Sequence, residues 1–233
     1  MLELSVVGPR HHEARPALLS SPEIGYSSPD SEVPSVSGIP NGRPVICVFG
    51  SYSPKPGSLL YQLAYDIGHA LATAGYTIAN GGYDGTMEAS AKGAKDAGGK
   101  TIGVTCSAFD TARGRTLAAN PWIDREIHHT DVMLRIKDMM IMSDGYVILE
   151  GGTGTMTELS LVWEYVCKQL IPPRPIFVVG DFWRPMIERI IAQRPRHGQH
   201  VYLVDTPRQI VDIATRTVPP GIGRLGASSS VGS

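Results

Sequence analysis

Short apolar segments alternate with longer segments of helical character through the middle of this chain, and no other feature of the sequence constrains the fold more. Parallel strands need a long crossover between them, usually a helix, so this alternation is typical of a parallel sheet covered by helices. The expected strands are nearly all apolar, which indicates that both faces of the sheet are buried. The sequence therefore predicts an α/β fold, a Rossmann-like, doubly wound parallel sheet flanked by helices.

Strands and helices can be placed on this pattern. Strands are expected at residues 44–50, 76–80, 101–106, 145–150 and 175–180, with a weaker one at 200–205. Helices are expected at residues 58–74, 84–97, 131–142, 155–169, 184–193 and 207–215. Together these elements predict one Rossmann-like domain over residues 44–218.

The two ends of the chain differ from this middle part in composition. Residues 1–43 combine several prolines with many serines and show no sustained apolar period, and residues 219–233 have the same character. Such segments bury too little apolar surface to fold alone. We therefore expect a flexible leader at 1–43 and a flexible tail at 219–233.

Charge and hydropathy exclude several classes of partner. The net charge is −1 and the pI is near 6.6, so the chain has no basic footprint for nucleic acid. The apolar runs fall short of the roughly 18 residues that span a bilayer, and no secretory signal pattern is found. We expect a cytoplasmic protein that binds neither nucleic acid nor membrane, with buried thiols at Cys47, Cys106 and Cys167 rather than disulfides.

Three expected strands are followed by loops rich in glycine or serine. The loops read GSYSPKPGS after the first strand, NGGYDGT after the second and EGGTGT after the fourth. The carboxyl ends of parallel strands meet at one edge of the sheet, so we expect these loops to converge there. Backbone N–H groups near a helix N-terminus attract anions, so a ligand that carries a phosphate is expected, although each loop taken alone is equally consistent with simple turn geometry.

Several cofactors and ions are disfavoured. The first loop lacks the G-x-G-x-x-G pattern of dinucleotide sites, the third loop lacks the Gly-Lys-Thr/Ser ending of ATPases, and no lysine stands in a Schiff-base context. His128 and His129 are neighbours that would face opposite ways in a strand, and His197 and His200 lack a carboxylate partner. We therefore predict no cofactor and no metal.

Glu158 and Arg135 each have a structural and a catalytic interpretation. Thr155 to Glu158 reads T-x-x-E, a capping-box pattern in which the glutamate only satisfies a helix-start N–H group, and the spacing alone favours this cap. Arg135 is consistent with a solvated helix face or with a pair to Asp138, three residues on. The residues taken one at a time leave both alternatives open.

The segment EGGTGTMTE, residues 150–158, resembles the P-G-G-x-G-T-x-x-E motif of the lysine decarboxylase-like family, better known as cytokinin-activating nucleoside 5′-monophosphate phosphoribohydrolases. That family also has an arginine in a methionine-bounded helix ahead of the motif, and MLRIKDM at 133–139 supplies it. The likeness extends over most of residues 44–179. The resemblance implies an enzyme that hydrolyses a nucleoside 5′-monophosphate, AMP-like, to a free base and ribose 5-phosphate.

The resemblance also implies roles for individual residues. Arg135 and Glu158 would be the catalytic pair, with the phosphate against Gly151, Gly152, Gly154 and Thr155, and with Ser51, Gly81 and Gly82 closing the other side. The family's dimers imply a homodimer in which the methionine-rich helix faces the second subunit, although methionine stripes more often pack in a core.

Two positions depart from the family pattern. Glu150 stands where the family has proline, and Ile136 stands where a lysine follows the arginine in the cytokinin-activating members. The segment GTMEASAKGA also resembles a sister branch that includes a proposed molybdenum-cofactor carrier, which binds a phosphorylated pterin without hydrolysing it. A non-catalytic carrier of a phosphorylated pterin or nucleotide is therefore the alternative to the hydrolase.

Overall fold

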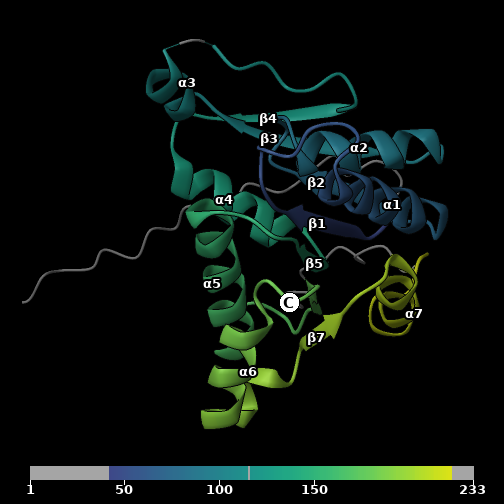
Figure 1. Ribbon diagram of the computed structural model, residues 1–233, viewed down its shortest axis with the longest axis vertical. Helices are drawn as coiled ribbons and strands as arrows, with labels where there is room; N and C mark the ends of the chain where they lie inside the picture. Colours follow the sequence, from purple (N-terminus) through teal and green to yellow (C-terminus); the bar gives the residue numbers. More distant parts are fainter. Residues whose placement is uncertain (1–41, 115, 222–233) are drawn as a thin grey trace, which may run out of the picture. The chain divides into compact units, whose positions relative to one another are not determined.

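Seven parallel strands form one sheet in the computed structural model, which describes residues 42–114 and 116–221 (Figure 1). Their order across the sheet is β4-β3-β2-β1-β5-β6-β7. The strands are β1 (Val45–Phe49), β2 (Thr77–Asn80), β3 (Thr101–Cys106), β4 (Arg125–His129), β5 (Gly145–Ile148), β6 (Ile176–Val179) and β7 (Val201–Val204).

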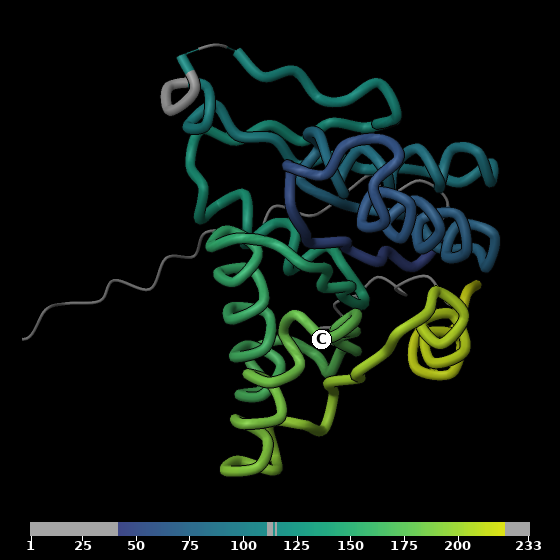
Figure 2. Tube along the Cα trace, viewed as in Figure 1, coloured from purple at the N-terminus to yellow at the C-terminus, as the bar shows by residue number. Residues whose placement is uncertain are grey.

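Helices cover both faces of this sheet, as the chain trace shows (Figure 2). Helices α1 (Leu59–Thr73), α2 (Thr86–Asp96) and α7 (Pro207–Thr217) lie on one face, and α4 (Val132–Met142), α5 (Thr153–Cys167) and α6 (Arg184–Gln193) lie on the other. A short helix α3 (Ala108–Arg113) follows β3, and a 3₁₀ turn η2 (Pro195–Gly198) precedes β7. The predicted doubly wound α/β fold is confirmed.

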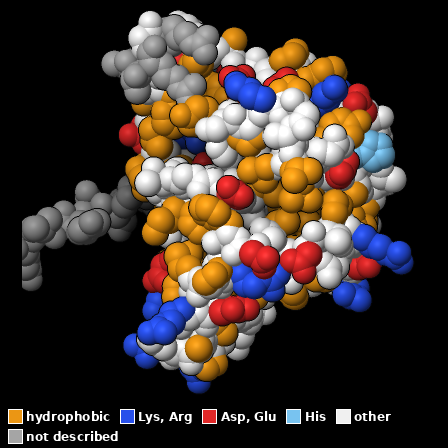
Figure 3. Space-filling model, viewed as in Figure 1, with side chains coloured by type: hydrophobic (Ala, Val, Ile, Leu, Met, Phe, Trp, Pro, Cys, Tyr) orange, Lys and Arg blue, Asp and Glu red, His pale blue; other side chains and the backbone are white. Residues whose placement is uncertain are grey.

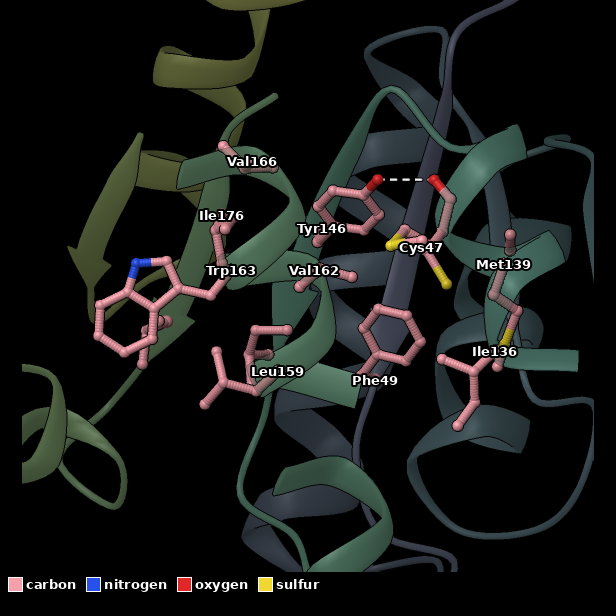
Figure 4. Close-up of a cluster of buried hydrophobic side chains, with 14 of the residues drawn as sticks. Cys47, Phe49, Ile136, Met139, Tyr146, Leu159, Val162, Trp163, Val166 and Ile176 are labelled. Carbon is pink, nitrogen blue, oxygen red and sulfur yellow. Dashed lines mark hydrogen bonds between the residues drawn. The ribbon is translucent and has the colours of Figure 1, made fainter. Parts of the chain in front are cut away.

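The two cores follow from the alternation of side chains along each strand. In β1, Cys47 and Phe49 point to the face covered by α4 and α5, whereas Ile46 and Val48 point to the face covered by α1 and α2. The first of these cores is shown in Figure 4. Met139, Met140 and Met142 are buried in it, so these three methionines pack inside the chain and do not face a second subunit.

The expected strands and helices all form, but two elements were missed. Strand β4 reads REIHH, and its burial alternates between half-buried and exposed because it lies at the edge of the sheet. It therefore lacks the apolar run that marks the inner strands. Helix α3 has only six residues, too few for a hydrophobic period. The expected leader and tail fall almost wholly outside the described residues.

The sheet has one topological switch point between β1 and β5. The chain moves outward from β1 through β2 and β3 to β4, then returns to the other side of β1 with β5 and continues outward to β7. The crossovers after β1 and β5 therefore leave the sheet in opposite directions, and a crevice opens between their first loops at the carboxyl edge. The loop after β1 and the loop EGGTGT after β5 meet at this place.

Helices α1 and α2, which follow the first two loops, cross at close range through glycine. A Cβ atom added to Gly68 of α1 would overlap the backbone carbonyl of Ser90 in α2. Because backbone cannot move aside as a flexible side chain can, the helices must separate if this position is enlarged. The pair of helices is thus held at the spacing that glycine permits.

Gly68→Ala is expected to destabilise the protein by about 1–3 kcal/mol, since overpacking outweighs the roughly 1 kcal/mol that alanine gains over glycine in a helix. Urea unfolding at neutral pH measures this difference. Thr73→Ala, on the exposed face of the same helix, is the control and should stay within about 0.5 kcal/mol of the wild type. A Gly68→Ala protein more stable than the wild type would contradict the close crossing.

Candidate functional site

A pocket of about 580 Å³ opens at the switch point of the sheet. Its walls come from the loops after β1, β2 and β5, from the start of α5, and from α3 and α4. The lining residues are Gly50, Ser51, Tyr52, Ser53, Tyr83, Met87, Phe109, Leu117, Arg135, Gly152, Thr153, Gly154, Thr155 and Glu158.

The start of helix α5 forms one wall of this pocket. Gly152 is the N-cap residue, and no side chain caps the first turn. The helix is 15 residues long, and its first N–H groups carry the positive end of the helix dipole. Thr155 is buried in the first turn and lines the pocket, so backbone donors and a hydroxyl group are available to an anion at this wall.

Arg135 of α4 is buried against the inner wall of the pocket, with 5% of its surface exposed. Its Nε donates a hydrogen bond to the Val104 carbonyl at 2.7 Å, and Nη2 donates to the Gly81 carbonyl at 3.2 Å. A Cβ at Gly81 would overlap Nη2, so glycine is required there for the guanidinium to fit. The side chain is thus fixed by backbone carbonyls from β3 and from the loop after β2.

Glu158 of α5 contacts Arg135 and also lines the pocket. Its Oε1 accepts a hydrogen bond from Arg135 Nη1 at 3.4 Å, and 9% of its surface is exposed. Burial raises the pKa of Glu158 from its ordinary 4.5 to about 7, although the positive charge of Arg135 opposes this shift. The carboxyl group is therefore close to half ionised at neutral pH, as suits a group that accepts a proton in catalysis.

The capping role considered for Glu158 is wrong, and so is the solvated or Asp138-paired position considered for Arg135. Helix α5 begins at Thr153, two residues before the expected start, and Glu158 is buried one turn inside it rather than at a cap. The T-x-x-E spacing misleads because the glycine-rich loop runs directly into the helix and hides its first residue. Arg135 lies on a buried face, and Asp138 contacts His129 at 2.9 Å.

Of the other expected site residues, four line the large pocket, one lines an adjoining pocket and two line neither. Ser51, Gly152, Gly154 and Thr155 line the 580 Å³ pocket with the catalytic candidates. Gly151 lines an adjoining pocket of about 350 Å³.

Gly81 and Gly82 line neither of these pockets. The carbonyl of Gly81 holds Arg135. Gly82 donates its N–H to Asn80 and accepts hydrogen bonds from Asn120. Both residues therefore build the wall behind the guanidinium.

Sequence reasoning missed the apolar end of the pocket. Tyr83, Met87, Phe109 and Leu117 line it together with Tyr52. The rings of Tyr83 and Phe109 pack edge to face, and the guanidinium carbon of Arg135 lies 5.4 Å from the centre of the Phe109 ring. Tyr83 follows Gly82 in a loop already singled out, whereas Phe109 and Leu117 belong to a segment with no recognisable motif.

Ile136 and Glu150, the two departures from the family pattern, do not line the large pocket, and neither do the three cysteines. Ile136 is buried in the core beneath α4. Cys47 and Cys106 are buried, as expected, and Cys167 is half-buried. Among residues 42–114 and 116–221, no group of three or more histidine, cysteine or acidic side chains is placed to hold a metal. No helix formed by the described residues is long and apolar enough to cross a membrane.

This fold and pocket define a class, the Rossmann-like α/β proteins whose ligand site lies where the strand order reverses. Within that class the chain belongs to the SLOG cluster4 family, which it matches over residues 43–211. Two relatives were compared by sequence. A protein of Archaeoglobus fulgidus is 35% identical over 103 residues, and the cytokinin riboside 5′-monophosphate phosphoribohydrolase of Mycobacterium tuberculosis is 33% identical over 123 residues.

Each of these sequence matches covers only part of this chain and part of the relative. They cover 43% and 51% of this chain, and 62% and 61% of the relatives' own lengths. Among solved structures, the molybdenum cofactor binding protein of Rippkaea orientalis superimposes with a TM-score of 0.59 at 22% identity, over 75% of this chain and 96% of that one. The match to the phosphoribohydrolase and the shared fold confirm the resemblance drawn from the motif.

The raised pKa of Glu158 makes a prediction about stability. The folded protein keeps the Glu158 proton up to about pH 7, whereas the unfolded chain releases it near 4.5. Wild-type stability should therefore fall, relative to a Glu158→Gln variant that imitates the protonated form, as pH rises from 4.5 to 7.

The change in relative unfolding free energy across this window is expected to be about 3 kcal/mol. Urea unfolding of both proteins at pH 4.5, 6 and 8 measures it. The test is how the difference in unfolding free energy between the two proteins changes with pH, not its size at any one pH. A constant difference at all three values would show that Glu158 titrates as an ordinary exposed glutamate.

Proposed function

We propose that the protein hydrolyses a nucleoside 5′-monophosphate to a free base and ribose 5-phosphate, without a cofactor. The observation that carries this proposal is the buried pair of Glu158 and Arg135, 3.4 Å apart, in the pocket formed by the uncapped start of α5. The sequence likeness to a phosphoribohydrolase supports it. The pocket of about 580 Å³ is large enough for a nucleotide.

The phosphate is proposed to bind at the polar end of the pocket. The first N–H groups of α5 and the hydroxyl groups of Ser51, Ser53 and Thr155 supply the donors. The charged lining residues of this pocket are Arg135 and Glu158, which contact each other. The anion therefore depends on backbone donors and the helix dipole, which position the sugar for reaction.

The base is proposed to bind at the opposite, apolar end. Phe109, Tyr83 and Leu117 offer ring faces and aliphatic surface of the kind on which planar bases stack. With phosphate and base at the two ends, the ribose and its C1′ atom lie between them, beside the Arg135–Glu158 pair. This arrangement puts the bond to be broken next to the charged groups.

The proposed reaction uses these groups in one displacement. A water molecule attacks C1′ while the bond from C1′ to the base nitrogen breaks, and the base leaves with the bonding electrons and takes up a proton from solvent. The Glu158 carboxylate accepts a proton from the water and stabilises the positive charge that develops on the sugar. Arg135 holds Glu158 in place and favours its ionised form, since its charge lowers the carboxyl pKa.

One observation favours a second candidate, a carrier that holds a phosphorylated pterin or nucleotide intact. The molybdenum cofactor binding protein of Rippkaea orientalis has the same fold, with a TM-score of 0.59 over 75% of this chain. The same anion site and apolar wall would hold a pterin phosphate. Tight pterin binding together with no release of base from any nucleotide would favour the carrier.

We also propose that the protein forms a homodimer. Met133 and Leu134 at the start of α4 and Met156 in the first turn of α5 are exposed by 57%, 51% and 45%. Such large apolar side chains near the pocket suit contact with a second copy.

Hydrolysis of AMP is expected to be at least about a hundred-fold faster than hydrolysis of adenosine, because phosphate binding energy positions the sugar. Chromatography of released adenine measures both rates. Glu158→Gln should remain folded and lose turnover, and Glu164→Gln, exposed on the same helix, should keep it. Equal rates for AMP and adenosine would contradict the proposed phosphate site.

The apolar wall can be tested separately from the phosphate site. Phe109→Ala should weaken AMP binding by about ten-fold through loss of stacking, and should leave ribose 5-phosphate binding within about two-fold of the wild type. Titration calorimetry with ribose 5-phosphate and with the carbocyclic analogue of AMP, which is not hydrolysed, measures the two affinities. Equal losses for both ligands would show that Phe109 supports the site as a whole rather than the base.

A further inference from the structure

A pocket of about 350 Å³ adjoins the large pocket and is not lined by Arg135. It shares Ser51 and Ser53 with the large pocket, and it is completed by Pro54, Ser58, Leu60, Glu150 and Gly151. Glu150 is the charged residue in this lining, and it is exposed. Lys55, the next residue after Pro54, is exposed and does not line the pocket.

The backbone holds Glu150 in this position. The preceding residue, Leu149, donates its N–H to the Phe49 carbonyl and accepts a hydrogen bond from the indole N–H of Trp183, both at 2.9 Å. After Glu150 the chain enters α5 within three residues. The carboxylate is thus attached to a fixed part of the chain, directly before the loop that forms the proposed phosphate site.

A ligand with one phosphate group fits the charges of the two pockets, and a longer phosphate chain does not. When the phosphate binds at the start of α5 and the base points toward Phe109, any further phosphate group extends past Ser51 and Ser53 into the adjoining pocket. Among the described residues, that pocket is lined by hydroxyl groups and one negative charge, and by no lysine, arginine or histidine. A β-phosphate there would be repelled by Glu150.

We infer that Glu150 restricts this site to nucleoside monophosphates, by repelling the additional phosphate groups of di- and triphosphates. This inference rests on the proposed function, because it requires the phosphate to bind at the start of α5. It assigns Glu150 a role in specificity and none in the chemical step. The face of the molecule in Figure 3 carries acidic and basic side chains interspersed.

The test is titration calorimetry of AMP and ADP, as carbocyclic analogues whose bond to the base is not hydrolysed, in EDTA to remove divalent cations, with three proteins: wild type, Glu150→Gln and Glu164→Gln. Glu164 is exposed on α5 and lines neither pocket, so its substitution is a charge-matched control. Wild type should bind ADP about ten-fold more weakly than AMP, and Glu150→Gln should reduce this gap to about two-fold. Glu164→Gln should keep the wild-type gap.

The salt dependence gives a second readout. Because the repulsion acts through solvent-exposed charges, raising the ionic strength should narrow the wild-type gap and leave that of Glu150→Gln unchanged. An unchanged ratio of ADP to AMP affinity in Glu150→Gln overturns the inference alone. Failure of all three proteins to bind AMP overturns the proposed phosphate site, and with it this inference.

Discussion

The buried contact between Arg135 and Glu158 is the interaction on which the candidate site depends. An arginine and a glutamate from successive helices can meet only because α4 and α5 lie on the same face of the sheet, with β5 between them in sequence. Each group would be costly to bury alone. The carbonyls of Val104 and Gly81 each accept a further hydrogen bond from the guanidinium, and the carboxyl group is left near half ionisation.

This arrangement supports the proposed anion site, since the one cation that the described residues place in the lining of the large pocket, Arg135, already contacts Glu158. The charges of Arg135 and Glu158 offset each other only in part, because the carboxyl group is near half ionisation, and the uncapped first turn of α5 adds further positive potential. Such a source suits a single phosphate group. The inferred role of Glu150 agrees with this, since its carboxylate in the adjoining pocket would act against a ligand with more negative charge.

The sheet and the convergence of the loops could be predicted from the sequence, for a physical reason. Strands buried on both faces must be apolar, and the glycine-rich loops follow strands that end at the same edge. The edge strand β4 and the short helix α3 lack these signals, so Phe109 remained unrecognised as a pocket residue. Residue spacing also favoured a capping role for Glu158, and only the family resemblance paired it with Arg135.

The most direct measurement of the central claim is the ionisation of Glu158 itself. Carbon-13 NMR of protein labelled at the glutamate carboxyl carbons, with Glu158→Gln to assign the signal, gives its pKa in the folded state. The account predicts titration near pH 7, and a higher pKa in Arg135→Met because the guanidinium lowers it. A Glu158 signal that titrates near 4.5, or that does not respond to loss of Arg135, would contradict the buried pair.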